Sequence, residues 1–217
     1  MIQIEACVES LEAAVAAAAG GAQRIELCAN LAAGGTSPDS AVLAACLSQL
    51  AIPIFVMVRP HAAGFCYTAA EHETMLEETR RAKRAGAHGI VTGSLRPNGT
   101  IDEARTRGLI DAARPLPVTF HRAFDSCDDV EETLETVIAL GASRVLTSGR
   151  GRSASHGAAA IAHLVRLAAG RIGILAGGGI NGDNVAELVR TSGVREVHLS
   201  TKDAEKIRRV VESVRAR

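Results

Sequence analysis

Apolar and polar residues follow two alternating patterns along the whole chain. Short apolar runs, typical of buried strands, fall at 2–8, 52–59, 117–122 and 171–176. Four further runs each begin a few residues after a glycine that ends a helix-like segment, and these glycines are Gly21, Gly86, Gly141 and Gly193. The pattern therefore predicts eight strands, with a glycine before every second one.

A helical pattern follows each predicted strand. The predicted helices cover residues 9–19, 37–50, 69–85, 101–114, 128–140, 157–169, 183–192 and 203–216. Some of them begin with recognisable capping residues. Ser37 followed by Pro38 gives the second helix an N-cap and a proline at its first position, and Asp125 to Asp129 supply acidic caps to the fifth.

Strict alternation of strand and helix, with strands too apolar to face water on one side, predicts a parallel sheet covered by helices. Such a sheet either closes into a TIM-type (β/α)8 barrel or stays open and doubly wound. The barrel is favoured, because the units are of even length and no glycine fingerprint follows the first strand. Since no linker interrupts the chain, we predict an α/β fold with a single barrel domain over residues 1–217.

Composition supports this fold and argues against some classes of function. Hydrophobic residues make up 47% of the chain and aromatic residues only 2%, which favours a core of tightly layered aliphatic side chains. The formal net charge of +0 gives no overall field that would attract nucleic acid or anionic lipid. No leader pattern opens the chain, and no stretch reaches the roughly 18 apolar residues of a spanning helix. We therefore predict a soluble cytoplasmic protein without nucleic-acid or membrane partners.

The five cysteines are an odd number in a chain without export features, so we predict reduced thiols. Ile-Glu-Ala-Cys, ending at Cys7, returns as Ile-Glu-Leu-Cys, ending at Cys28. Because strand side chains alternate, Glu5 shares a face with Cys7, and Glu26 shares one with Cys28. Thiols on neighbouring strands either fill apolar space or bind a soft ion such as Cu(I). Cys66, on a loop above them, is a candidate third sulfur.

Functional groups of this fold gather at the C-terminal ends of the strands. Buried carboxylates such as Glu5 and Glu26 need partners there. Arg59, His121 and Arg122 also lie at strand ends and can pair with them. These residues form either a structural ion-pair network or an active site, in which the carboxylates and the histidine transfer protons and the arginines hold a carboxylate or oxyanion.

The ends of strands six to eight predict an anion site. A glycine run after the seventh strand exposes backbone N–H groups before a helix, where phosphate commonly binds, although tight turns alone also require glycine. The candidate ligand-binding residues are Thr147, Ser148, Gly149, Gly177, Gly178, Gly179 and His198. They favour a small anionic metabolite, phosphorylated or not, and no organic cofactor is predicted.

Taken together, these motifs resemble the CutC family of copper homeostasis proteins over nearly the full chain. The matching stretches are E-A-C (5–7), R-I-E-L-C-A (24–29), G-G-T-S-P (34–38), R-P (59–60), G-F-C-Y (64–67), V-T-G (91–93), V-T-F-H-R-A-F-D (118–125), R-V-L-T-S-G (144–149) and E-V-H-L-S (196–200). The resemblance implies a cytoplasmic, homo-oligomeric TIM-type barrel that takes part in copper homeostasis. It also implies Cu(I) binding at Cys7 and Cys28. One departure is the segment after His198, which is shorter than in the family.

Two functions therefore stay open at the level of the sequence. One is a copper homeostasis protein that binds Cu(I) through cysteines at the barrel mouth. The other is an enzyme that acts on a small anionic metabolite. The second is a hypothesis because most of the polar residues in the shared motifs are Glu, Arg, His, Thr and Ser, which suit an active site better than a copper site.

Overall fold

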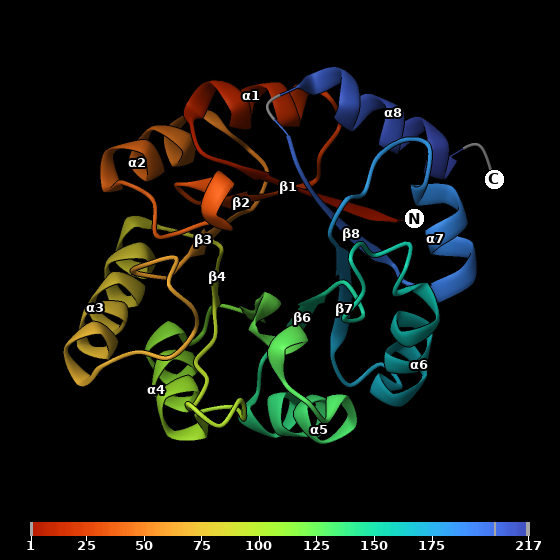
Figure 1. The fold of residues 1–217 in the computed structure, drawn as a ribbon. Coiled ribbons are helices and arrows are strands. Elements are labelled where there is room, and N and C mark those ends of the chain that lie inside the picture. The colour runs from red at the N-terminus through yellow and green to blue at the C-terminus, as the bar shows by residue number, and fades with distance from the viewer. Residues whose placement is uncertain (1, 202, 216–217) are drawn as a thin grey trace.

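The computed structural model describes residues 2–201 and 203–215, and over these residues eight parallel strands close into a barrel surrounded by eight helices (Figure 1). Every strand pairs in parallel with the next, and β8 returns to pair with β1. The predicted TIM-type barrel is therefore confirmed. The predicted domain and its last helix also include residues 1, 202, 216 and 217, which lie outside the described residues.

Each predicted strand and helix is present, with described ends that differ by a few residues. The strands are β1 (Gln3–Val8), β2 (Arg24–Leu27), β3 (Ile54–Met57), β4 (Gly89–Thr92), β5 (Val118–Phe120), β6 (Arg144–Thr147), β7 (Gly173–Gly177) and β8 (Glu196–Ser200). The α-helices are α1 (Leu11–Ala19), α2 (Ser40–Gln49), α3 (Ala69–Ala85), α4 (Glu103–Ala113), α5 (Val130–Leu140), α6 (Ala158–Ala168), α7 (Val185–Ser192) and α8 (Ala204–Arg215). Short 3-10 helices, η1 (Leu31–Ala33) and η2 (Arg122–Ser126), follow β2 and β5.

Local sequence explains where the helices end and begin. Gly86 and Gly141 follow α3 and α5 in the left-handed conformation, with φ of 94° and 89°, as the glycine spacing predicts. Asp129 caps the N-terminus of α5, again as predicted. The predicted N-cap at Ser37 is wrong, because Asp39 caps α2. The Ser37 hydroxyl instead accepts a hydrogen bond from the backbone N–H of Arg59 (2.9 Å).

The barrel wall separates an apolar outer face from a polar interior. Ile4 and Ala6 of β1 pack in the large core between the barrel and its helices. Cys7 belongs to a separate cluster inside the barrel. Glu5 lies between Ile4 and Ala6 in sequence and faces the interior with Cys7, as the alternation predicts. No helix in the described part of the chain is long and apolar enough to cross a membrane.

A charged layer, defined here as Arg24, Arg144, Glu196 and Glu5, lies beneath the barrel mouth. Arg24 forms an ion pair with Glu5 and donates a hydrogen bond to Glu196 at 2.6 Å. The Arg144 Nε lies 3.3 Å from the same Glu196 carboxylate. Both guanidinium groups lie over the ring of Phe55, at 5.1 and 4.6 Å. This layer closes the floor of the barrel with paired charges, which the sequence motifs did not predict.

Candidate functional site

A cavity of about 480 Å³ opens where the C-terminal ends of the strands converge. It receives side chains from both ends of the chain, because β8 lies beside β1 in the closed barrel. Most of the predicted site residues line it together. These residues are Cys7, Glu26, Arg59, His121, Arg122, Gly177, Gly178, Gly179 and His198.

The other predicted residues lie behind the cavity wall. Glu5 belongs to the charged layer beneath, and Cys28 is buried beside Cys7. Thr147, Ser148 and Gly149 do not line the cavity. The Thr147 hydroxyl and the Ser148 backbone N–H both donate hydrogen bonds to Asp125, the second at 3.0 Å. These hydrogen bonds connect the C-terminal end of β6 to η2. The sequence motifs did not predict this connection.

The two predicted thiols meet inside the barrel. The strand register pairs Cys7 with Glu26, and Cys28 follows just past the end of β2. The Cys7 and Cys28 sulfur atoms nevertheless lie 3.4 Å apart. The Cys28 sulfur also lies 3.5 Å from the Val8 carbonyl oxygen. Met57 belongs to the same buried cluster and supplies a third sulfur atom nearby. Cys66, the predicted third sulfur, is exposed and is not among the residues that line the cavity.

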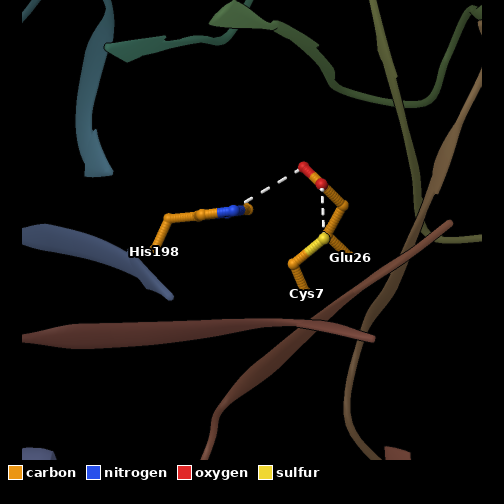
Figure 2. Close-up of side chains that lie close together, drawn as sticks. All are labelled: Cys7, Glu26 and His198. Atoms are coloured by element: carbon orange, nitrogen blue, oxygen red, sulfur yellow. Dashed lines mark hydrogen bonds and ion pairs between the residues drawn. The ribbon is translucent and has the colours of Figure 1, made fainter. Parts of the chain in front are cut away.

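Cys7, Glu26 and His198 place three kinds of ligand atom at one point of the interior (Figure 2). The Cys7 thiol donates a hydrogen bond to Glu26 Oε1 at 3.0 Å. The Nδ1 atom of His198 lies 3.9 Å from Glu26 Oε2 and 2.8 Å from Glu5 Oε1. One ligand atom from each of Cys7, Glu26 and His198 lies within 4.8 Å of the others, and all three residues are buried.

Neighbouring charges set the protonation of this group. Burial alone raises the pKa of Glu5, but the hydrogen bond with His198 and the charge of Arg24 outweigh it and lower the pKa to about 2. Burial raises the pKa of Glu26. The pKa of His198 is raised, because the charge of Glu26 and the hydrogen bond with Glu5 outweigh burial. The pKa values of the two carboxyl groups are thus shifted in opposite directions, downward for Glu5 and upward for Glu26.

The thiol of Cys7 is held in its protonated form. Its hydrogen bond with Cys28, its burial and the nearby Glu26 carboxylate all raise its pKa well above the ordinary value. A metal ion that binds Cys7 must displace this proton, because the thiolate is the ligand. Glu26 already accepts the hydrogen bond from that thiol and is placed to receive the proton.

On the opposite side of the cavity, His121 is a neutral histidine. Burial and the charge of Arg59 lower its pKa to about 3. Its Nδ1 accepts a hydrogen bond from the backbone N–H of Ala123 at 3.3 Å. The ring of Phe65 lies 4.8 Å from the His121 ring, and the Arg59 guanidinium lies 4.8 Å from the same phenyl ring. Phe65, which the sequence analysis did not single out, therefore positions both predicted residues.

The glycines after β7 make room for an arginine. A Cβ atom on Gly178, whose φ is 111°, would lie 3.0 Å from the Arg122 Nη1 atom. Arg122 in turn forms an ion pair with Asp125 and donates a hydrogen bond to the Ser148 hydroxyl at 2.9 Å. The glycine run does not open a helix directly, because α7 begins only at Val185. The expected helix N-terminus therefore lies several residues beyond the glycines.

The sequence model of the CutC family matches residues 2–203. The chain belongs to the CutC family. A CutC protein of Vibrio cholerae serotype O1 is 46% identical over 202 residues, which is 92% of this chain and 80% of that protein. The human copper homeostasis protein cutC homolog is 46% identical over 199 residues, covering 92% of this chain and 73% of the human one.

Solved structures show the same relationship. The crystal structure of CutC from Streptococcus agalactiae has a TM-score of 0.88 at 33% identity, and the match covers 93% of this chain and 99% of that one. Phosphoribosylanthranilate isomerase from Thermotoga maritima has a TM-score of 0.65 at 13% identity over the full length of both chains. The second likeness shows only that the two proteins share the barrel fold.

Proposed function

We propose that this CutC-family protein serves copper homeostasis in the cytoplasm by binding Cu(I) through Cys7 and Cys28. The observation that carries this proposal is the 3.4 Å contact between the two sulfur atoms. Cu(I) prefers soft sulfur ligands, and Cys7 and Cys28 offer two of them side by side. The homo-oligomeric assembly that family membership implies remains a prediction.

The surroundings of the two cysteines support a site for the ion as cargo. Both cysteines are buried in a cluster with Met57, Phe55 and Val91, and Glu26 accepts a hydrogen bond from Cys7 at its edge. Burial limits the access of water and oxidants to thiolates and to bound Cu(I). Cys7 lines the cavity, which gives an ion a route to the site from the barrel mouth.

Removing both thiols is expected to weaken Cu(I) binding. Reduced protein is titrated with Cu(I) against a chelating competitor, in the wild type and in the Cys7→Ser, Cys28→Ser double variant. We expect at least a ~10-fold loss of affinity, since changes to outer-shell residues alone cost about 10–100-fold. Cys66→Ser removes an exposed thiol instead and is the matched control. Equal affinity in the wild type and the double variant would rule out this site.

We propose, as a second candidate function, an enzyme that acts on a small anionic metabolite in the same cavity. Three buried side-chain atoms of the cavity wall have no hydrogen-bond partner among the described residues: Glu26 Oε2, Arg59 Nε and His121 Nε2. Buried polar atoms without partners cost free energy, so a polar ligand would stabilise this arrangement. Arg59 and Arg122 bring positive charge, and neutral His121, whose Nδ1 already accepts a hydrogen bond from Ala123, can donate one to such a ligand from Nε2.

Binding of a small anion is expected to raise the melting temperature in a saturable manner. The probes are inorganic phosphate, sugar phosphates and small carboxylates, each at rising concentration. Arg122→Gln, which removes the charge at the cavity rim, should abolish the shift. Arg166→Gln on α6 removes a positive charge from a residue that does not line the cavity and serves as the control. No shift with any phosphate or carboxylate would count against this function.

A further inference from the structure

Cys7, Glu26 and His198 form a cluster from which the copper proposal uses only Cys7. Its side chains come from β1, β2 and β8, which are adjacent in the closed barrel. All three line the cavity, whereas Cys28 does not. Figure 2 shows the three side chains directed toward one point from different sides of the interior. The cluster therefore offers one sulfur, one oxygen and one nitrogen ligand in a place that a small ion can reach.

Two further observations indicate a ligand at this point. Glu26 Oε2 is buried and has no hydrogen-bond partner among the described residues, while Oε1 of the same carboxylate is occupied by the Cys7 thiol. A free carboxylate oxygen in such surroundings is costly unless something positive binds to it. The nitrogen of the cluster that faces this oxygen is His198 Nδ1, which lies 3.9 Å away, beyond hydrogen-bonding distance.

His198 is also held in the way typical of metal-binding histidines. Its Nδ1 lies 2.8 Å from Glu5, and Glu5 is fixed by its ion pair with Arg24. A carboxylate on one ring nitrogen fixes the tautomer and orientation of the ring and leaves the other nitrogen as the metal ligand. The charged layer thus supplies the outer shell that a metal site requires.

We propose that Cys7, Glu26 and His198 form a second metal site, for a divalent ion of the Zn(II) type. Binding would release the Cys7 thiol proton and any second imidazole proton to water in the cavity. The resulting thiolate and the Glu26 carboxylate then balance the two positive charges of the ion, and the neutral imidazole completes the set. Three protein ligands beside an open cavity leave one position of a tetrahedral ion for water or another small ligand. The mixed set suits Zn(II), which accepts sulfur, nitrogen and oxygen, whereas Cu(I) favours the two sulfur atoms of Cys7 and Cys28.

This inference goes beyond copper binding and does not depend on it. The two sites share Cys7 and differ in every other ligand. An ion bound in one site therefore takes a ligand away from the other site. Bound Zn(II) should therefore weaken Cu(I) binding, and Cu(I) should displace Zn(II). Each site can be removed without the other, which makes the two proposals separately testable.

The test uses Co(II) as a spectroscopic substitute for Zn(II) on the full, reduced chain. Co(II) bound to a thiolate gives a sulfur-to-metal charge-transfer band, and Zn(II) should abolish this band by competition. We expect Cys28→Ser to keep the band and Cys7→Ser to lose it. His198→Asn and Glu26→Gln should each weaken Co(II) binding by at least ~10-fold. His198→Asn should leave Cu(I) affinity within about threefold of the wild-type value, because His198 is not a copper ligand.

Two outcomes would overturn the proposal. One is Co(II) binding that survives both His198→Asn and Glu26→Gln unchanged. The other is a thiolate band that depends on Cys28 as strongly as on Cys7, which would place Co(II) at the copper site. Glu26→Gln keeps the size of the side chain and an oxygen acceptor for the Cys7 thiol, so it tests the site if His198→Asn does not fold. Failure of Cu(I) binding with retained Co(II) binding would contradict only the copper proposal.

Discussion

Replacing Arg24 with methionine is expected to lower the free energy of unfolding by about 3–5 kcal/mol. Arg24 is buried and neutralises two carboxylates in the charged layer, Glu5 and Glu196. Methionine retains the length of the side chain and its contact with Phe55 but removes the charge. Glu5, which is completely buried, then retains His198 as its remaining charged partner.

The measurement is urea-induced unfolding of both proteins at neutral pH. Arg171→Met is the matched control, because Arg171 also pairs with a carboxylate, at 2.6 Å from Glu135, but both side chains are about half exposed. An exposed pair contributes about 0–1 kcal/mol, so the control should lose far less. Equal losses in the two variants would show that the charged layer does not stabilise the barrel as described.

The buried neutral histidine should make the protein less stable in mild acid. The pKa of His121 is lowered from 6.5 to about 3 in the folded chain, with burial the largest cause. Between these values the unfolded chain binds a proton that the folded chain does not, so stability falls as the pH falls through this window. From pH 8 to pH 5, His121 alone should lower the free energy of unfolding by about 2 kcal/mol, from ~1.4 kcal/mol per pKa unit.

His121→Asn isolates this effect. Asparagine retains an acceptor for the backbone N–H of Ala123 and does not titrate. Urea unfolding at pH 8 and pH 5 should therefore show a smaller loss of stability in the variant, by about 2 kcal/mol. The remaining groups, including His198 and Glu26, titrate in both proteins and cancel in the comparison. An identical loss in both proteins would mean that folding does not change the pKa of His121.

Much of the fold was predictable, because the two faces of a barrel strand meet different surroundings. Ile4 and Ala6 had to contact helices, and Glu5 and Cys7 therefore had to face the interior. The closed barrel also explains why Cys7 and His198 share one cavity although almost the whole chain lies between them. Capping was less predictable, since Ser37, Pro38 and Asp39 offer neighbouring choices and the loop from β2 decides among them.

The charged layer was missed, although the sequence contains a signal for it. Arg24, Gly89, Arg144 and Glu196 each stand three residues after a helix-ending glycine, so they begin the even-numbered strands at equivalent positions. In a barrel, inward residues of alternate strands share a layer, which places these four together. Gly89 provides space for the ring of Phe55, because a Cβ atom at this position would lie 2.4 Å from that ring.

The sequence by itself determined the order of strands and helices and the face on which each strand carries its acids and thiols. It did so because these features depend on residue spacing within one element. Only the tertiary structure decided which of those side chains touch: that Cys7 meets Cys28 and Glu26, that His198 meets Glu5, and that Thr147 and Ser148 bind Asp125 instead of lining the cavity. Such contacts depend on the register between strands and on the paths of loops, and both are set by the packing of the whole barrel.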